Sequence, residues 1–354
     1  MKPIEKWAEL VRKYDGPPLR LMEVCGTHTH RIFQYGIREM LSPRLELISG
    51  PGCPVCVTPS GYIDKAAALA LEENAVLCTF GDMIRVPGQE LSLASSQAKG
   101  GKVRIMYSPS DVAEWAKAEP EKTFYVAAVG FETTIPAYAL LMDKVIGEKI
   151  GNIRLLTSLK ALMPALSWIC ENSEELGGFI GPGHVSAVIG AAPYRLLCRR
   201  YGIPLAVAGF SYEHILAAVC DLVLQRRRGT SQVHNLYPEV VAEEGNEEAL
   251  RLIGRYFVKK DSVWRGLGAI PKSGYFLAPE YAGFDAGSQL ETGGAEDLQG
   301  CRCGSVIIGR EKPADCPHFG KTCTPLHPLG PCMVSTEGAC GIWHRYLQEG
   351  ANPL

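Results

Sequence analysis

The fold of this chain is decided by the stretch Leu45-Glu46-Leu47-Ile48-Ser49-Gly50-Pro51-Gly52-Cys53-Pro54-Val55-Cys56. Its first five residues predict a short strand, and the Gly-Pro-Gly turn predicts a loop that places two cysteines directly after that strand. A second apolar run, Leu19 to Val24, ends in the same way at Cys25-Gly26. Short strands that end in such loops and alternate with helical stretches indicate parallel sheets built from βαβ units.

The same alternation continues through the first two-thirds of the chain. Further strands are expected at 75–80, 103–107, 124–129, 153–156, 178–180 and 204–208. Two sets of four βα units predict an α/β fold with two similar parallel-sheet domains, residues 1–115 and 116–232. A helix is expected at 240–258, followed by many Gly and Pro residues and six cysteines. Residues 233–354 are therefore predicted to form a smaller, loop-rich and cysteine-rich domain, whose missing stability a metal site supplies.

The composition is that of a globular protein without a charged binding surface. The net charge is -2, hydrophobic residues make up 46% of the chain and charged residues 21%. We therefore expect no nucleic-acid partner and no membrane association, since the chain has neither a basic stripe nor a run of 18 apolar residues. The N-terminus has no apolar signal core, which predicts a cytoplasmic protein. In that reducing compartment, clustered cysteines indicate metal ligands or catalytic thiols rather than structural disulfides.

Several chemically active side chains follow the ends of predicted strands. They are Cys25, Cys53, Cys56, Asp82, Glu132 and His184. Because sites in parallel sheets form outside the carboxyl ends of the strands, we expect these residues to meet in one crevice between two α/β domains.

The Cys53–Cys56 pair has the spacing of a redox dithiol, and nearby Cys25 suits iron, copper or zinc. A structural half-zinc site is the alternative. His28 is interpreted as a proton or hydrogen-bond donor or as an ordinary loop residue, and His184 is equally ambiguous. Glu132 is either a carboxylate at a helix start or a site acid.

A second thiol centre is expected near the C-terminus. Cys303, Cys316, Cys323 and Cys340 offer four thiolates in irregular loops, and their wide spacing favours a [4Fe–4S] cluster over structural zinc. A set of free or disulfide-paired cysteines is the alternative. Cys301 and Cys332 leave the choice of ligands open from the spacing alone.

Several long motifs resemble the hydrogenase maturation factor HypD family. They are Glu23-Val24-Cys25-Gly26-Thr27-His28, Gly50-Pro51-Gly52-Cys53-Pro54-Val55-Cys56, Gly130-Phe131-Glu132-Thr133-Thr134, Gly181-Pro182-Gly183-His184, and the C-terminal cysteine pattern with Met333-Val334-Ser335 and Glu337-Gly338. They occur in the family's order and span nearly the whole chain.

The resemblance implies an iron-binding redox scaffold for the Fe(CN)2CO group of [NiFe] hydrogenases, rather than a conventional turnover enzyme. The partners it implies are HypC, and HypE with HypF as the cyanide donor. By the same resemblance, Cys25 and Cys56 bind the mononuclear iron, Cys53 completes the redox dithiol, and His28 and Glu132 act beside the iron ligands or handle protons. Cys303, Cys316, Cys323 and Cys340 bind the [4Fe–4S] cluster. The family's three domains agree with the division expected above.

Two rival functions belong to other classes. The first is a thiol–disulfide reductase fed by an iron–sulfur cluster, which needs Cys53 and Cys56 but not Cys25. The second is an interaction protein stabilised by zinc. Radical S-adenosylmethionine chemistry and P-loop nucleotide hydrolysis are not expected, since the sequence contains neither C-x3-C-x2-C nor GxxxxGK[ST].

Overall fold

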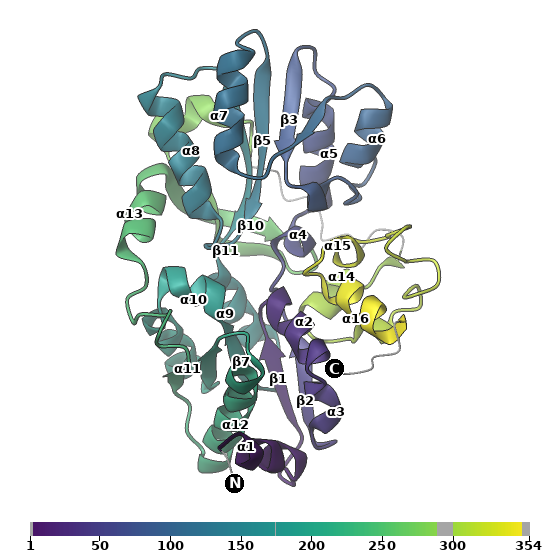
Figure 1. Cartoon of the computed structure of the whole chain (residues 1–354), viewed down its shortest axis with the longest axis vertical. Coiled ribbons are helices and arrows are strands. Elements are labelled where there is room, and N and C mark those ends of the chain that lie inside the picture. Colours follow the sequence, from purple (N-terminus) through teal and green to yellow (C-terminus); the bar gives the residue numbers. More distant parts are fainter. Residues whose placement is uncertain (1–2, 174, 289–299, 349–354) are drawn as a thin grey trace.

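The structure is a computed structural model that describes residues 3–173, 175–288 and 300–348. Its strands form two sheets, one above the other in Figure 1, with the cysteine-rich C-terminal segment at their side. The predicted α/β class is therefore confirmed, with two sheets dominated by parallel pairing.

The first sheet has five strands in the order β2-β1-β7-β8-β9, and every pair in it is parallel. Its strands are β1 (Leu19–Glu23), β2 (Leu45–Ser49), β7 (Leu176–Pro182), β8 (Leu205–Ala208) and β9 (Val233–Asn235). Strand β1 lies between β2 and β7, so its side chains other than half-buried Arg20 are buried.

The second sheet has six strands in the order β10-β11-β6-β5-β3-β4. Its strands are β3 (Ala75–Thr79), β4 (Val103–Ile105), β5 (Thr123–Gly130), β6 (Ile153–Lys160), β10 (Phe257–Trp264) and β11 (Gly268–Leu277). The first four run parallel, whereas β10 and β11 form an antiparallel hairpin that pairs with β6.

The helices connect these strands and cover the sheets (Figure 1). They are α1 (Pro3–Arg12), α2 (Gly26–Gln34), α3 (Ile37–Met40), α4 (Pro54–Val57), α5 (Ser60–Leu69), α6 (Leu93–Ala98), α7 (Pro109–Ala118), α8 (Ile135–Gly147), α9 (Leu162–Asn172), α10 (Gly183–Ile189), α11 (Arg195–Tyr201), α12 (Tyr212–Arg228), α13 (Glu247–Tyr256), α14 (Cys303–Ile307), α15 (Pro331–Val334) and α16 (Ala339–Gln348). Short 3-10 turns lie at Gly81–Met83, Ala192–Tyr194, Pro279–Phe284 and Pro313–Asp315.

The strand order differs from the expectation that each sheet comes from one continuous segment. Strands from 1–115 enter both sheets, and so do strands from 116–232. Residues 233–354 also contribute β9, β10 and β11, so that segment is loop-rich only in its later part. The expected helix at 240–258 is shorter, and residues 257–277 form a hairpin instead. Local sequence patterns do not specify which distant strands pair, because long-range packing decides it.

One hydrophobic core joins both sheets and the C-terminal segment. It contains Met22 from the first sheet, Leu77 from the second and Cys332 from α15, all buried. In the same region α14 and α15 pack against α4, and α16 packs against α2. The cysteine-rich segment is therefore held against the two helices that follow β1 and β2.

Candidate thiol and metal site

The first thiol centre lies at the carboxyl ends of two neighbouring strands. Cys25 follows β1 as the N-cap of α2, and Cys53 follows β2 as the N-cap of α4. A Cβ atom built on Gly52 would lie 2.4 Å from the backbone nitrogen of Cys25, so the two strand-end loops touch. Only a residue without a side chain permits this close approach.

The Cys-x-x-Cys pair is a disulfide in this structure. Cys53 and Cys56 are bonded with their Cα atoms 5.3 Å apart, and both are buried. The short helix α4 makes this geometry possible because Pro54 begins it and the backbone N–H of Cys56 donates to Sγ of Cys53 at 3.2 Å. The turn therefore brings the two cysteines within bonding distance, as the Cys-x-x-Cys spacing allows.

A narrow pocket beside this turn also receives the C-terminal segment. Its lining includes Cys53, Cys56, Cys332 and Glu337. The segment can come this close because residue 26 is a glycine. A Cβ atom at that position would lie 2.4 Å from the carbonyl oxygen of Glu337. A third thiol, from a distant part of the sequence, thus lines the same pocket as the disulfide.

Cys25 is a buried, free cysteine in this environment. Burial raises the pKa of the Cys25 thiol to about 12, and the nearby carboxyl of Glu337 adds to the increase, while the backbone N–H groups of His28 and Thr27 oppose it. Without a cation the thiol is therefore protonated at neutral pH. A bound metal cation would favour the thiolate instead.

Glu23 is a buried carboxyl group that the sequence analysis did not select as a site residue. Its Oε2 accepts the backbone N–H of Cys25 at 3.2 Å, and its Oε1 accepts the hydroxyl of Thr29. Burial raises the pKa of Glu23 to about 7. The sequence signal that could have identified Glu23 is an acidic residue at the end of an apolar strand, two positions before Cys25.

His28 lies on α2 and is fully buried. Its Nε2 is 2.9 Å from the carbonyl oxygen of Gly209, and its Nδ1 has no hydrogen-bond partner among the described residues. Burial lowers the pKa of His28 to about 4. The imidazole is therefore neutral at pH 7, with Nε2 donating and Nδ1 free to accept a hydrogen bond.

His184 lies farther out, at the exposed start of α10. The ring of Phe210 lies between the two histidines, with centroid distances of 4.8 Å to His28 and 4.1 Å to His184. Both ring contacts are tilted, and His184 is not among the residues that line the thiol pocket.

Glu132 follows β5 in the other sheet and is buried. Its carboxylate accepts the backbone N–H of Leu162 at 3.0 Å, where α9 begins. Burial raises the pKa of Glu132 to about 7. Burial raises the pKa of the Tyr194 phenol, and the charges of Glu132 and Cys25 raise it further. Tyr194 therefore lies near both residues. Glu132 therefore holds a helix start and also lies within electrostatic reach of the region around Cys25.

The second thiol centre is an enclosed pocket in the C-terminal segment. Its lining includes five cysteines, Cys301, Cys303, Cys316, Cys323 and Cys340. All four cysteines expected from the spacing are thus brought together, with Cys301 in addition. Thiol sulfur atoms in an apolar enclosure suit an iron–sulfur cluster or another thiophilic metal.

Cys332 links the two thiol centres. Its Sγ lies within 4.8 Å of the Sγ atoms of Cys303 and Cys340, and this buried group could hold a metal ion. Cys332 also lines the pocket of the Cys53–Cys56 disulfide. The spacing of the cysteines had left its role open, because only the packing of α15 on α4 brings it there.

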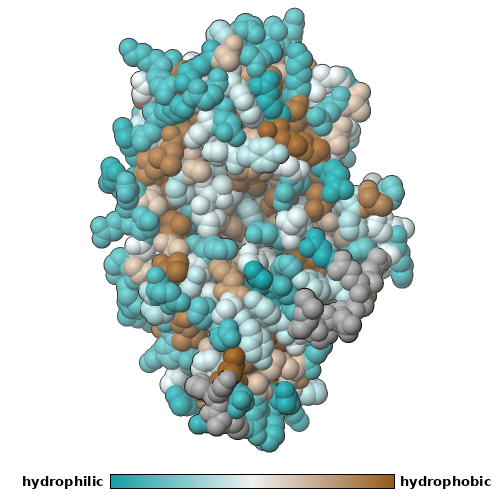
Figure 2. Space-filling view, in the orientation of Figure 1, coloured by the Kyte–Doolittle hydropathy of each residue, from teal (hydrophilic) through white to brown (hydrophobic). Residues whose placement is uncertain are grey.

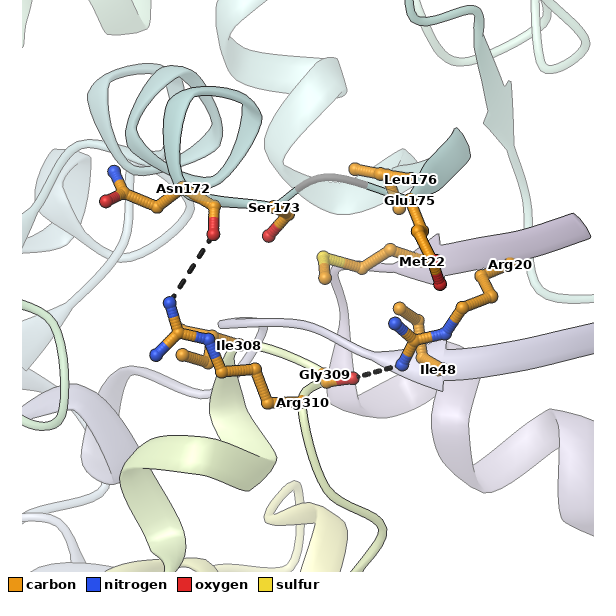
Figure 3. A pocket seen from close by; sticks show the side chains of 10 residues that line it. All are labelled: Arg20, Met22, Ile48, Asn172, Ser173, Glu175, Leu176, Ile308, Gly309 and Arg310. Atoms are coloured by element: carbon orange, nitrogen blue, oxygen red, sulfur yellow. Dashed lines mark hydrogen bonds between the residues drawn. The ribbon is translucent and has the colours of Figure 1, made fainter.

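A larger cavity of about 340 Å³ contains no cysteine (Figure 3). Both arginines that line it already form hydrogen bonds with the backbone. Arg20 donates to the carbonyl oxygen of Gly309 at 2.5 Å, and Arg310 donates to the carbonyl oxygen of Asn172 at 3.4 Å. These bonds tie β1 and α9 to the C-terminal segment. The cavity is therefore interpreted as part of that structural contact.

The outer surface is mainly polar on the face shown in Figure 2, where hydrophobic side chains are interspersed among hydrophilic ones. Among the described residues, no helix combines the length and the hydropathy that crossing a membrane requires.

Together these features define a thiol-rich α/β protein suited to redox or metal chemistry. Residues 2–347 match the family model described as "HypD: Hydrogenase formation hypA family". The chain is 41% identical to hydrogenase maturation factor HypD of Rhodobacter capsulatus, over 93% of this chain and 89% of that protein. It is 41% identical to that of Escherichia coli strain K12, over 94% and 90%, and 39% identical to that of Cupriavidus necator, over 96% and 92%. The chain belongs to the HypD family of hydrogenase maturation factors.

Proposed function

We propose that this protein is the scaffold on which the Fe(CN)2CO group of [NiFe] hydrogenases is assembled. In this proposal Cys25 and Cys56 bind the cargo iron, and Cys53 pairs with Cys56 as the redox dithiol. The observation that carries it is the contact of Gly52 with the backbone of Cys25, because it brings the loops of two strand ends together. Thiolates donate electrons well, and an electron-rich iron retains CO and cyanide.

Cargo iron needs free thiolates, so the Cys53–Cys56 disulfide must first be reduced. This reaction breaks the S–S bond and takes up two electrons and two protons to give two thiols, and a thiol releases its proton again when its sulfur binds iron as a thiolate. Burial and the charge of Asp82 raise the pKa of Glu337, which lines the same pocket. We assign Glu337 as a proton donor to a sulfur that is released.

Cys303, Cys316, Cys323 and Cys340 are the proposed ligands of a resident [4Fe–4S] cluster. The thiol-lined enclosure fits such a group. When bound, the cluster supplies electrons for reduction of the disulfide. The residues around it keep water away, since Cys303, Cys323 and Cys340 are all buried.

The remaining site residues act around the iron in this proposal. His28 stays neutral and accepts a hydrogen bond at Nδ1, which has no partner among the described side chains and backbone groups. Glu132 retains a proton near neutral pH and positions α9. His184 supports His28 through the ring of Phe210.

Family membership supports a set of partners for this scaffold. We propose that HypC binds beside the cargo iron and completes its ligand shell with a thiol. HypE, acting with HypF, delivers cyanide, and the assembly takes place in the cytoplasm.

Infrared spectroscopy tests the proposed cargo. The chain is co-expressed with its partner, purified without oxygen and analysed for iron and sulfide. Bands of metal-bound CO and cyanide are expected in the wild type and absent in Cys25→Ala, which keeps the cluster. Cys220→Ala, which removes another buried thiol, is the matched control and keeps the bands. Cyanide-bound iron in Cys25→Ala would overturn the role of Cys25.

A cluster-dependent thiol–disulfide reductase is the second candidate function. The position of Cys332, between the cluster pocket and the disulfide, favours it. A reductase turns over a disulfide substrate with Cys25 removed, whereas the scaffold loses its cargo. The same Cys25→Ala variant therefore separates the two functions.

A further inference from the structure

The tip of the β10–β11 hairpin lies against the Cys-x-x-Cys turn. Residues 265–267 connect the two strands, and Arg265 is the first of them. Its backbone N–H donates to the carbonyl oxygen of Val57 at 2.9 Å, and its Nε donates to the carbonyl oxygen of Thr58 at 2.9 Å. Val57 is the last residue of α4, and Thr58 is its C-cap. The hairpin therefore binds the carbonyl end of the helix that carries Cys56.

The guanidinium group of Arg265 holds a second segment at the same time. The residue is 5% exposed, and its Nη2 donates to the carbonyl oxygen of Pro87 at 3.2 Å, in the loop that precedes α6. A helix as short as α4 has few internal hydrogen bonds, so the groups that bind its end carbonyls help to decide whether it keeps its shape. One buried, planar side chain thus fixes α4 to a neighbouring loop.

The next residue, Gly266, extends this contact to the cysteine-rich segment. Its φ is +79°, and a Cβ atom at this position would lie 2.3 Å from the Cα atom of Gly304. Gly304 lies in α14, directly after the proposed cluster ligand Cys303, and α14 also packs against α4. Two adjacent residues of the hairpin tip therefore contact the redox turn and the cysteine-rich segment.

We propose that Arg265 is a positioning residue for the Cys53–Cys56 pair, which it keeps in the geometry of the closed disulfide by clamping the carbonyl end of α4. The inference rests on the proposed redox use of this pair. In the oxidised form the S–S bond also holds the turn, whereas in the dithiol form the hydrogen bonds of Arg265 remain as a restraint. Loss of Arg265 therefore gives the dithiol more conformational freedom than the disulfide, and the equilibrium shifts toward the dithiol.

Equilibration of the full chain with glutathione buffers tests this clamp. Two glutathione thiols reduce the disulfide to two cysteine thiols and form one glutathione disulfide, so two electrons and two protons are transferred. Alkylation followed by mass spectrometry measures the reduced fraction of the peptide that contains Cys53 and Cys56. In Arg265→Met the equilibrium constant should shift by about tenfold or more toward the dithiol, which corresponds to about 30 mV for a two-electron couple.

Asn152→Ala is the matched control for a general loss of stability. The amide of Asn152 binds the carbonyl end of α7 in a similar way, since its Nδ2 donates to the carbonyl oxygens of Ala116 at 3.0 Å and Glu119 at 3.3 Å. Both variants should unfold at a lower temperature than the wild type, because each removes the donor from carbonyl groups at a helix end. Only Arg265→Met should change the redox equilibrium.

A pair of glycine variants decides the outcome if Arg265→Met does not fold. Gly266→Ala places a methyl group against the backbone of Gly304, so the hairpin tip must move and the equilibrium should shift toward the dithiol. Gly268→Ala has nearly the same backbone strain, with a φ of +81°, but its methyl group meets nothing within 4 Å. It should keep the wild-type equilibrium.

The role of Arg265 is overturned if Arg265→Met keeps the wild-type equilibrium, if Asn152→Ala shifts it equally, or if the two glycine variants do not differ. A shift toward the disulfide would overturn it too, because the charge of Arg265 would then stabilise thiolates instead. These outcomes leave the proposed cargo iron untouched, since the infrared bands test it separately. A wild-type disulfide that does not exchange with glutathione would contradict both the redox dithiol and this inference.

Discussion

Gly52 lies directly against the backbone of Cys25. A Cβ atom at position 52 would be 2.4 Å from the nitrogen and 2.5 Å from the Cα atom of Cys25. This contact joins the loops that follow β1 and β2, and it holds the backbone of Cys25 against the loop that leads into the Cys53–Cys56 turn. The geometry of the first thiol centre therefore depends on a residue with no functional group of its own.

Gly52→Ala should destabilise the protein because backbone atoms, which cannot move aside cheaply, occupy the space of the new methyl group. We expect a loss of about 1–3 kcal/mol in the free energy of unfolding, measured by denaturant titration. Gly61→Ala is the matched control, since a Cβ atom there meets nothing within 4 Å. Gly61 lies within α5, so alanine should stabilise it by about 0.5–1 kcal/mol. Equal stability of the two variants would contradict the contact.

Glu132 should make the protein less stable as the pH rises. The pKa of this carboxyl is raised from 4.5 to about 7 in the folded chain, so the folded state binds more protons than the unfolded state between these values. Its contribution to stability is fully present below pH 4.5 and is lost as the pH rises through about 7.

Glu132→Gln removes this contribution while its amide oxygen can still accept the N–H of Leu162. Relative to Glu132→Gln, the wild type should lose about 1–3 kcal/mol of unfolding free energy between pH 5 and pH 8. Denaturant titrations at both pH values measure the difference. The exposed control Glu121→Gln should follow the wild type. If the unfolding free energies of the wild type and Glu132→Gln changed with pH in parallel, burial would not raise the pKa of Glu132.

Cys332→Ala should slow reduction of the Cys53–Cys56 disulfide while leaving the fold intact. Cys332 lines the pocket of that disulfide and lies within 4.8 Å of the other thiols of its group. We expect a decrease of about tenfold or more in the rate at which free Cys53 and Cys56 appear after addition of an electron donor, because thiol exchange depends on access. Alkylation followed by mass spectrometry measures it. Cys198→Ala, which removes another buried thiol, should react at the wild-type rate.

Cys316→Ala and Cys323→Ala should each lose the iron–sulfur cluster. Both cysteines line the thiol pocket. Visible absorbance and sulfide content measure the loss, and Cys170→Ala is the control that keeps both. Cys301→Ala should also keep the cluster if Cys303 is the ligand. Zinc without sulfide in the wild type would contradict an iron–sulfur site.

Much of the first thiol centre could be predicted from local sequence. Strands β1 and β2 were expected within one or two residues, because a short apolar run that ends in a glycine loop is a local signal. That the loops after β1 and β2 meet, with Gly52 against the backbone of Cys25, agrees with the rule that the carboxyl ends of neighbouring parallel strands lie at one edge of a sheet. Four C-terminal cysteines were expected together, and they do line one pocket.

The sequence by itself therefore determined the α/β class, most strands and the positions of the reactive thiols, because these depend on short-range patterns and on residue chemistry. Only the tertiary structure decided the interleaved strand order, the β10–β11 hairpin and the meeting of Cys332 with the Cys53–Cys56 turn. It also decided which polar groups are buried, such as Glu23 and Lys160. Pairing and burial depend on contacts between residues far apart in the chain, and those contacts form only when the whole core packs.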